Sequence, residues 1–156
     1  MIFLTVGTQL PFDRMVKVVD EFAKTSDLEF MAQVGNNDYQ CQNMKAQDFY
    51  PPDELNQIFL GAEVIVSHAG MGSIINALKL KKPIVIFPRL SKFGEHRNDH
   101  QVDTLESFSK IQGVHVASTE DELREVLSRL SELEEPQGLE SPDRARLVNK
   151  IREFCI

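Results

Sequence analysis

The sequence predicts an α/β fold, a Rossmann-like, doubly wound parallel sheet with helices on both faces. Three observations lead to this class. Short apolar runs rich in Val and Ile alternate along the chain with segments of helical periodicity. Polar, glycine-containing segments follow several of these runs, where the carboxyl ends of parallel strands would meet. The length of 156 residues, with 42% hydrophobic and 26% charged residues, suits one domain with a single core.

The first half of the chain contains three expected strands and two expected helices. Residues 2–6 are apolar and β-branched, which suits a buried strand, and Pro11 stands in the first turn of the helix that follows. Residues 28–34 form the second apolar run, which a turn cluster at residues 35–37 closes. The remaining elements are a short strand at residues 46–50 and a short helix at residues 53–61.

The second half continues the alternation. Strands are expected at residues 63–67, 83–87 and 114–117, and helices at residues 72–80 and 99–109. Thr119 and Glu122 form a capping box that opens a helix running to about Leu133. Pro136 and Gly138 break that helix, and a last helix begins near Ser141. We therefore expect a domain at residues 1–134 and, within residues 135–156, a C-terminal helix that packs on the domain or docks a partner.

Charge and composition limit the possible functions. The net charge of −7 argues against a nucleic-acid surface, so any phosphate site must be local. The two cysteines, Cys41 and Cys155, lack metal-ligand spacing and suit free thiols in a reducing compartment. The opening MIFLTVGTQLPFD has no basic segment and its apolar run is too short for a signal peptide or a membrane span. These features predict a cytoplasmic location.

The first candidate motif is Gly7-Thr8-Gln9, directly after the first strand. The glycine permits a close approach of the backbone, and the Thr8 hydroxyl can bond a phosphate oxygen. A tight turn that needs a glycine explains the same residues and is the commoner explanation of a lone motif. The dinucleotide fingerprint G-x-G-x-x-G is absent.

A second motif, SHAGMGS at residues 67–73, joins a strand to a helix. Its two glycines free backbone amides, Ser73 can cap the helix or bond a ligand, and His68 offers an N–H to a phosphate. A capped junction with a satisfied histidine is equally compatible with this segment alone. Neither a Walker A loop nor a G-x-S-x-G nucleophile elbow is present.

A third candidate region is the polar loop at residues 89–101, which is long for a strand-to-helix connection. Its donors and acceptors could contact sugar hydroxyls and phosphate; they are Glu95, His96, Arg97, Asn98, Asp99, His100 and Gln101. The alternative is a solvated loop in which Asp99 caps the next helix. The spacing of its histidines and of His68 fits no standard zinc pattern, so no metal site is expected.

Three segments together resemble a known family. MIFLTVGTQLPFDRMV, SHAGMGSIINALKLKKPIVIFPR and GEHRNDHQVDTLE are similar to PssE-type subunits of bacterial exopolysaccharide glycosyltransferases. These subunits resemble the soluble subunit of the eukaryotic two-part UDP-GlcNAc transferase of the dolichol pathway. Both resemble the C-terminal, donor-binding half of MurG and the other family 28 GT-B glycosyltransferases. The resemblance is most specific in residues 1–14 and 66–101 and weak after about residue 119.

The resemblance implies a single GT-B half-domain that binds a UDP-sugar. It assigns the diphosphate and nucleotide to Gly7, Thr8, His68, Ala69, Gly70, Met71, Gly72, Ser73 and Asn76. It assigns the sugar to Glu95, Arg97, Asn98, His100 and Gln101. Related domains often carry an acidic residue for the ribose hydroxyls where this chain has Asn76. The general base is unassigned, with His68 and His96 as candidates beside a partner residue.

A GT-B enzyme also needs an acceptor-side domain. The resemblance implies a membrane-associated PssD-type partner that completes an inverting, metal-independent transferase, with no cofactor beyond the UDP-sugar donor. The acceptor would be a lipid-linked saccharide in exopolysaccharide or capsule biosynthesis, and the partner would recruit this chain to the inner face of the membrane. The alternative is a non-catalytic subunit that stabilises or enhances its partner. A dehydrogenase is less compatible, because the dinucleotide fingerprint is missing.

Overall fold

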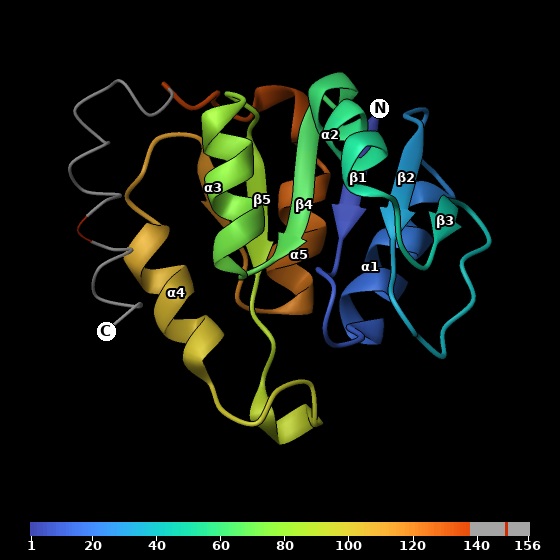
Figure 1. The fold of residues 1–156 in the computed structure, drawn as a ribbon, viewed down its shortest axis with the longest axis horizontal. Coiled ribbons are helices and arrows are strands. Elements are labelled where there is room, and N and C mark those ends of the chain that lie inside the picture. The colour runs from blue at the N-terminus through green and yellow to red at the C-terminus, as the bar shows by residue number, and fades with distance from the viewer. Residues whose placement is uncertain (138–148, 150–156) are drawn as a thin grey trace.

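The structure, a computed structural model, describes residues 1–137 and residue 149. Six parallel strands form one sheet between two layers of helices (Figure 1). The strands are β1 Ile2–Thr5, β2 Phe30–Gln33, β3 Lys45–Gln47, β4 Val64–His68, β5 Ile84–Phe87 and β6 Val114–Val116. The helices are α1 Asp13–Ala23, α2 Pro52–Gly61, α3 Met71–Lys79, α4 His100–Phe108 and α5 Glu120–Leu127, with short 3-10 turns η1 Ser91–Phe93 and η2 Leu130–Glu132. The predicted fold class is confirmed.

The order of strands in the sheet is β3-β2-β1-β4-β5-β6. Leu4 of β1 pairs with Ala32 of β2 on one side and with Val66 of β4 on the other. The chain therefore runs from β1 to one edge and returns to β4 to build the other half. The carboxyl ends of β1 and β4 form the switch point, where doubly wound sheets bind their ligands.

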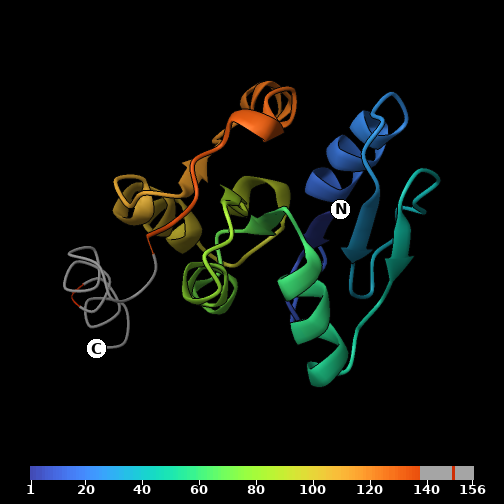
Figure 2. The same cartoon turned by 90° about the horizontal axis from the view of Figure 1, so that it is seen from above.

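Each face of the sheet packs against its own helices. Ile2, Leu4 and Val6 point into an apolar layer shared with α1 and α5. Phe3 and Ile65 point the other way, into a layer shared with α2, α3 and α4. Figure 2 shows α1 (blue) and α5 (orange) on one side of the sheet and α2 and α3 (green) on the other. Both faces of the central strands are therefore apolar, in agreement with the continuous apolar runs from which these strands were predicted.

The boundaries of two elements differ most from the prediction. The Thr119–Glu122 capping box is present, but α5 ends at Leu127 and not near Leu133. The Ser128 hydroxyl donates to the Glu125 carbonyl, a side-chain bond that competes with the helical ladder, and the chain continues as η2. The third strand is shorter than predicted and fully exposed. The predicted last helix lies outside the described residues, apart from residue 149. Among the helices that are described, none is both long and apolar enough to cross a membrane.

Candidate functional site

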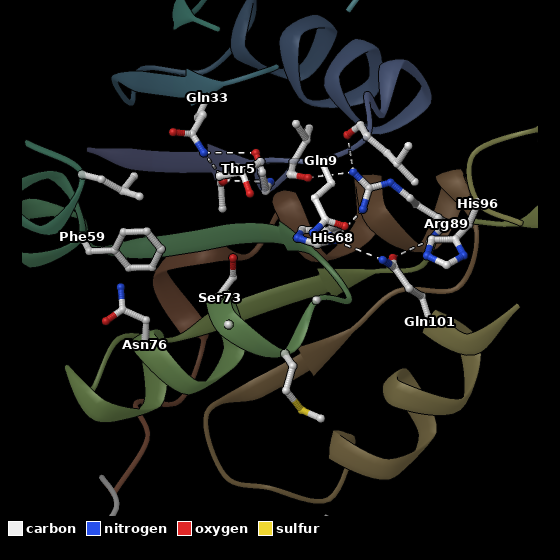
Figure 3. Close-up of a pocket in the computed structure, with 18 residues that line it drawn as sticks. Thr5, Gln9, Gln33, Phe59, His68, Ser73, Asn76, Arg89, His96 and Gln101 are labelled. Atoms are coloured by element: carbon white, nitrogen blue, oxygen red, sulfur yellow. Dashed lines mark hydrogen bonds between the residues drawn. The ribbon is translucent and has the colours of Figure 1, made fainter. Parts of the chain in front are cut away.

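A cavity of about 350 Å³ opens at the carboxyl ends of β1 and β4 (Figure 3). The β1–α1 loop, with Gly7 and Thr8, forms one wall, and the β4–α3 turn forms another. Phe59 of α2 lies at one end, while Arg89 and Gln101 lie at the other. The two glycine-containing motifs therefore face the same space at the switch point of the sheet.

Hydrogen bonds from Thr5 of β1 and Gln33 of β2 hold the β1–α1 loop. Gly7 has φ +81°, and its N–H donates to Thr5 Oγ1 at 3.1 Å. Gln33 Nε2 donates to the Gly7 carbonyl at 3.2 Å, and Gln33 Oε1 accepts from the Tyr50 N–H at 3.0 Å. Gln33 is 1% exposed, so these bonds are shielded from competing water. The conformation of the loop is thus fixed by the protein itself.

The His68 ring fills the space between Gly7 and Gly70. A Cβ on Gly7 would come within 2.7 Å of His68 Nε2, and a Cβ on Gly70 would come within 2.5 Å of the same atom. Both distances are shorter than real Cβ contacts allow, so any larger residue would displace the ring. A Cβ on Gly72 would meet nothing within 4 Å. Gly7 and Gly70 therefore make room for the imidazole, a role that the sequence did not suggest.

Arg89 and Gln101 fix the orientation of that imidazole. Arg89 Nη1 lies 2.7 Å from His68 Nδ1, and Gln101 Nε2 lies 3.2 Å from the same nitrogen. A guanidinium can only donate, so Nδ1 is the acceptor and the proton of the neutral ring is on Nε2. Gln101 Oε1 accepts from the Arg89 backbone N–H at 3.1 Å, which places the amide nitrogen of Gln101 toward His68.

The surroundings of His68 keep it neutral. Burial lowers the pKa of His68 to about 3, and electrostatic repulsion by Arg89 and by the protonated form of His96 acts in the same direction. Burial also lowers the pKa of Arg89 to about 10, which leaves its guanidinium charged at neutral pH. His68 is therefore a neutral Nε2–H donor beside the cavity and not a cation.

The N-terminus of α3 is open toward the cavity. Gly70 is the N-cap residue, and no side chain makes a capping bond there. Ser73, for which the sequence left a cap or a ligand contact open, makes no cap, and it lines the cavity (Figure 3). The free amides of the first turn, at Met71, Gly72 and Ser73, carry the positive end of the helix dipole. This combination suits a phosphate or diphosphate group.

The far end of the cavity is partly apolar. Leu55 and Phe59 of α2 and Asn76 of α3 line it. Phe59 and Asn76 stand on opposite sides of this end in Figure 3. An aromatic ring opposite an amide suits a ligand with a flat ring and polar edges, such as a nucleoside.

Glu95, in the β5–α4 loop, forms an ion pair with Arg14 of α1. Its carboxylate accepts from Arg14 Nε and Nη2, both at 2.9 Å, and from the Leu90 N–H at 3.0 Å. The side chains of Arg14 and Glu95 are 13% and 10% exposed, so this bidentate pair is largely shielded from water. Glu95 does not line the cavity.

The other residues of this loop divide into two groups. Gln101 and His96 reach the cavity, whereas Arg97, Asn98 and His100 are exposed and do not line it. Asn98 Oδ1 accepts from the His100 N–H at 2.9 Å. The alternative in which Asp99 caps α4 is wrong, because Asp99 makes no capping bond and its Oδ1 accepts from the Ser91 N–H at 2.9 Å.

The structure has a second cavity outside the switch point. This larger cavity of about 510 Å³ lies beside the β2–β3 loop, lined by polar residues such as Asn37, Asp38 and Gln40. None of the residues that line it belongs to a helix. In the part of the chain that is described, no group of three or more His, Cys, Asp or Glu side chains could hold a metal ion.

Comparison with known families identifies the domain. Residues 1–153 match the glycosyltransferase family 28 C-terminal domain. The chain belongs to this family. A search of curated proteins gave no match.

Solved structures agree on the fold of this family 28 domain. The glycotransferase of kitacinnamycin superposes with a TM-score of 0.63 at 22% identity, and the spinosyn forosaminyltransferase SpnP with 0.60 at 20%. These matches cover 98% and 97% of this chain but 38% of each enzyme. The NMR structure of ALG13 gives 0.59 at 21% identity, covering 86% of this chain and 87% of that one. The chain thus spans well under half of the two transferases and most of ALG13.

The structure brings most of the predicted diphosphate residues of this family 28 domain together. Those that line the cavity are Gly7, Thr8, His68, Gly70, Met71, Gly72, Ser73 and Asn76. Ala69 is 2% exposed and bonds the Phe87 carbonyl through its N–H. The prediction missed Thr5, Gln33, Phe59 and Arg89. Two of these residues stand at or just after the end of an apolar run, Gln33 in the second run and Arg89 soon after Phe87. A polar residue at such a position was the one indication in the sequence that it could belong to the site.

Proposed function

We propose that this domain binds the UDP-sugar donor of a two-component glycosyltransferase. The observation that carries the proposal is the convergence of two glycine-containing loops and the uncapped N-terminus of α3 on one cavity at the switch point. Such a cavity offers backbone amides and an N–H from His68 to a diphosphate. Membership of family 28 supports a sugar nucleotide as its source.

The ligand would lie along the cavity in a definite direction. The diphosphate would accept hydrogen bonds from the first turn of α3 and from His68 Nε2–H. Ribose and uracil would extend toward Asn76 and Phe59, where the wall is partly apolar. The sugar would then lie near His96 and Gln101 at the opposite end. The sugar contacts proposed for Glu95, Arg97, Asn98 and His100 would need the β5–α4 loop to turn inward.

The reaction would be an inverting displacement at the anomeric carbon. The bond from that carbon to the β-phosphate oxygen breaks as the acceptor hydroxyl attacks, and a base takes the hydroxyl proton. The α3 amides and His68 would stabilise the charge that develops on the departing UDP. Because Nε2 of His68 already carries a proton and Nδ1 accepts from Arg89, His68 suits a donor better than a base. His96 or a residue of the partner is the better candidate for the base.

The acceptor side would come from a second chain. The 38% coverage of two transferases is consistent with a half-enzyme. We propose a membrane-associated PssD-type partner that binds a lipid-linked saccharide and holds this chain at the cytoplasmic face of the membrane, in exopolysaccharide or capsule synthesis. The isolated chain would then bind donor but transfer little sugar.

Calorimetric titration with UDP, uridine and ADP tests donor binding, and a transfer assay with and without the partner tests catalysis. The proposal expects binding of UDP over uridine and ADP, and transfer by the pair only. Transfer by the isolated chain at the rate of the pair would contradict the two-component claim. No binding of any uridine nucleotide, with partner activity still raised, would support the enhancer alternative.

A further inference from the structure

Arg89 joins the two loops that face the cavity. Its side chain is almost fully buried, at 3% exposure. Nη1 contacts His68 Nδ1 at 2.7 Å, while Nη2 donates to the carbonyls of Val6 at 2.7 Å and Leu10 at 2.6 Å. Val6 and Leu10 flank the Gly7-Thr8-Gln9 segment. A single guanidinium thus connects both ends of the β1–α1 loop to the ring of the β4–α3 turn, as the dashed lines of Figure 3 show.

The bonds at His68 leave one arrangement of protons. Arg89 has no acceptor, and the Gln101 amide is oriented by its bond to the Arg89 N–H, so both neighbours donate to Nδ1. The remaining nitrogen, Nε2, must carry the proton of the neutral ring. For a Cβ on Gly7 that nitrogen is the nearest atom, at 2.7 Å, and for a Cβ on Gly70 it is the second nearest, at 2.5 Å, after Cε1 of the same ring. The donor of the ring is therefore directed between the two loops that line the cavity.

Arg14, a second arginine nearby, has the partners expected of a structural residue and serves as a comparison. Arg14 and Arg89 both lie over the Phe12 ring, at 5.5 and 5.1 Å from its centroid. Arg14 bonds the carboxylate of Glu95. Within the described residues Arg89 bonds no carboxylate, and its buried Nε has no hydrogen-bond partner. A buried guanidinium without a carboxylate partner lowers the stability of the fold. The bonds of Arg89 therefore point to a role other than stabilisation.

We propose that Arg89 is a positioning residue of the nucleotide site, which fixes His68 as the Nε2-protonated donor and closes the β1–α1 loop around it. The identity of the ligand, a nucleoside diphosphate, rests on the proposed function. The arrangement of His68 itself does not, because it is a property of the ligand-free protein.

The first experiment measures the protonated nitrogen of His68 by ¹⁵N NMR of the ligand-free chain. The wild type is expected to show the Nε2-protonated form alone, unchanged between pH 7 and pH 5 (a range above the pKa of about 3). Arg89→Met should give a mixture of both neutral forms and a ring that titrates closer to its ordinary pKa. Arg14→Met, which removes an arginine from the same Phe12 ring, should keep the wild-type pattern.

The second experiment measures the affinity for UDP. Loss of a charge-assisted hydrogen-bond network should weaken UDP binding by about tenfold or more in Arg89→Met, and by less than about twofold in Arg14→Met. UDP should also shift the Nε2–H resonance of the wild type.

The outcomes separate this inference from the proposed function. An Nδ1-protonated or mixed His68 in the wild type would overturn the inference without any variant, even if Arg89→Met failed to fold. So would a folded Arg89→Met that keeps wild-type affinity. If the wild type shows fixed Nε2–H but does not bind UDP, the proposed function fails and the role of Arg89 in holding the ring stands.

Discussion

The loops at the two ends of the cavity are held in different ways. The β1–α1 loop and the β4–α3 turn are fixed from behind by buried side chains, chiefly Gln33 and Arg89. Their groups that face the cavity are backbone amides and one imidazole. The β5–α4 loop is fixed by Glu95 and Asp99, two of the polar side chains that its sequence offers to a ligand. In the first two loops, the side chains that support the backbone are distinct from the groups that would bind the ligand, so this part of the site is preformed.

The β1–α1 loop and the β4–α3 turn form the rigid end of the cavity, and they suit the diphosphate of a sugar nucleotide. A diphosphate is the same in every UDP-sugar, so a preorganised set of donors suits it. The β5–α4 loop faces solvent along much of its length and would meet the part of the ligand that varies. Four experiments test this division.

Gly70→Ala should disrupt the rigid end. The added Cβ would collide with the His68 ring, which Arg89 holds in place, so we expect a loss of about 2 kcal/mol of stability and of measurable UDP binding. Gly72→Ala is the matched control, since its Cβ meets nothing within 4 Å. It should be as stable as the wild type or slightly more stable, because alanine favours a helix. Denaturant unfolding measures both, and equal stability of the two variants would contradict the packing described.

Glu95→Gln should show that the Glu95 carboxylate stabilises the β5–α4 loop and does not bind UDP. The change removes the charge from a shielded bidentate pair with Arg14 and should lower the free energy of unfolding by about 1–2 kcal/mol. Affinity for UDP should change by less than about threefold, since the carboxylate lies outside the cavity. Arg97→Gln, at an exposed position, should leave stability unchanged. A Glu95→Gln variant that is fully stable but binds UDP at least about tenfold more weakly would reverse the assignment.

The stability of the chain should fall with pH in a way that depends on His68. Its pKa is lowered to about 3 in the folded chain, from 6.5, so between these values the unfolded chain binds more protons. The stabilisation is complete above pH 6.5 and is lost as the pH falls toward 3. The slope due to this one group is at most about 1.4 kcal/mol per pH unit. Unfolding of His68→Asn between pH 7 and pH 4 should show a shallower fall than that of the wild type, and parallel curves would contradict a neutral, buried His68.

Asn76→Asp should give the smallest effect. A carboxylate accepts from both ribose hydroxyls, which an amide oxygen and nitrogen do less well, so we expect about threefold tighter binding of UDP. The 2′-deoxy analogue of UDP should gain little from the change. If the two nucleotides gained equally, Asn76 would not lie beside the ribose.

The sequence predicted the fold more completely than the site. Apolar runs and turn residues located the five buried strands because local periodicity carries that information, whereas the bounds of the exposed β3 were predicted less well. The chain also revealed Gly7, His68 and Gly70, but not that the two glycines make room for the imidazole. That relation depends on β1 and β4 being neighbours, although they are far apart in the sequence.

The buried residues that support the loops of the site by hydrogen bonds were the hardest to predict. Gln33 lies within an apolar run, and Arg89 stands at the start of the polar loop of residues 89–101. Their roles come from hydrogen bonds across the sheet, to Gly7 and to Val6, which no local pattern encodes. Conversely, Glu95 was predicted to contact the ligand because nothing in the neighbouring sequence showed that it would form an ion pair with Arg14.

The proposed diphosphate site lies between the β1–α1 loop and the N-terminus of α3. An NMR titration of the ¹⁵N-labelled chain with UDP tests it residue by residue. The amide signals of Gly7, Thr8, Gly72 and Ser73 should move most. Movement centred on the polar cavity beside the β2–β3 loop, around Asn37 and Gln40, would contradict it, and so would no movement at any concentration of UDP.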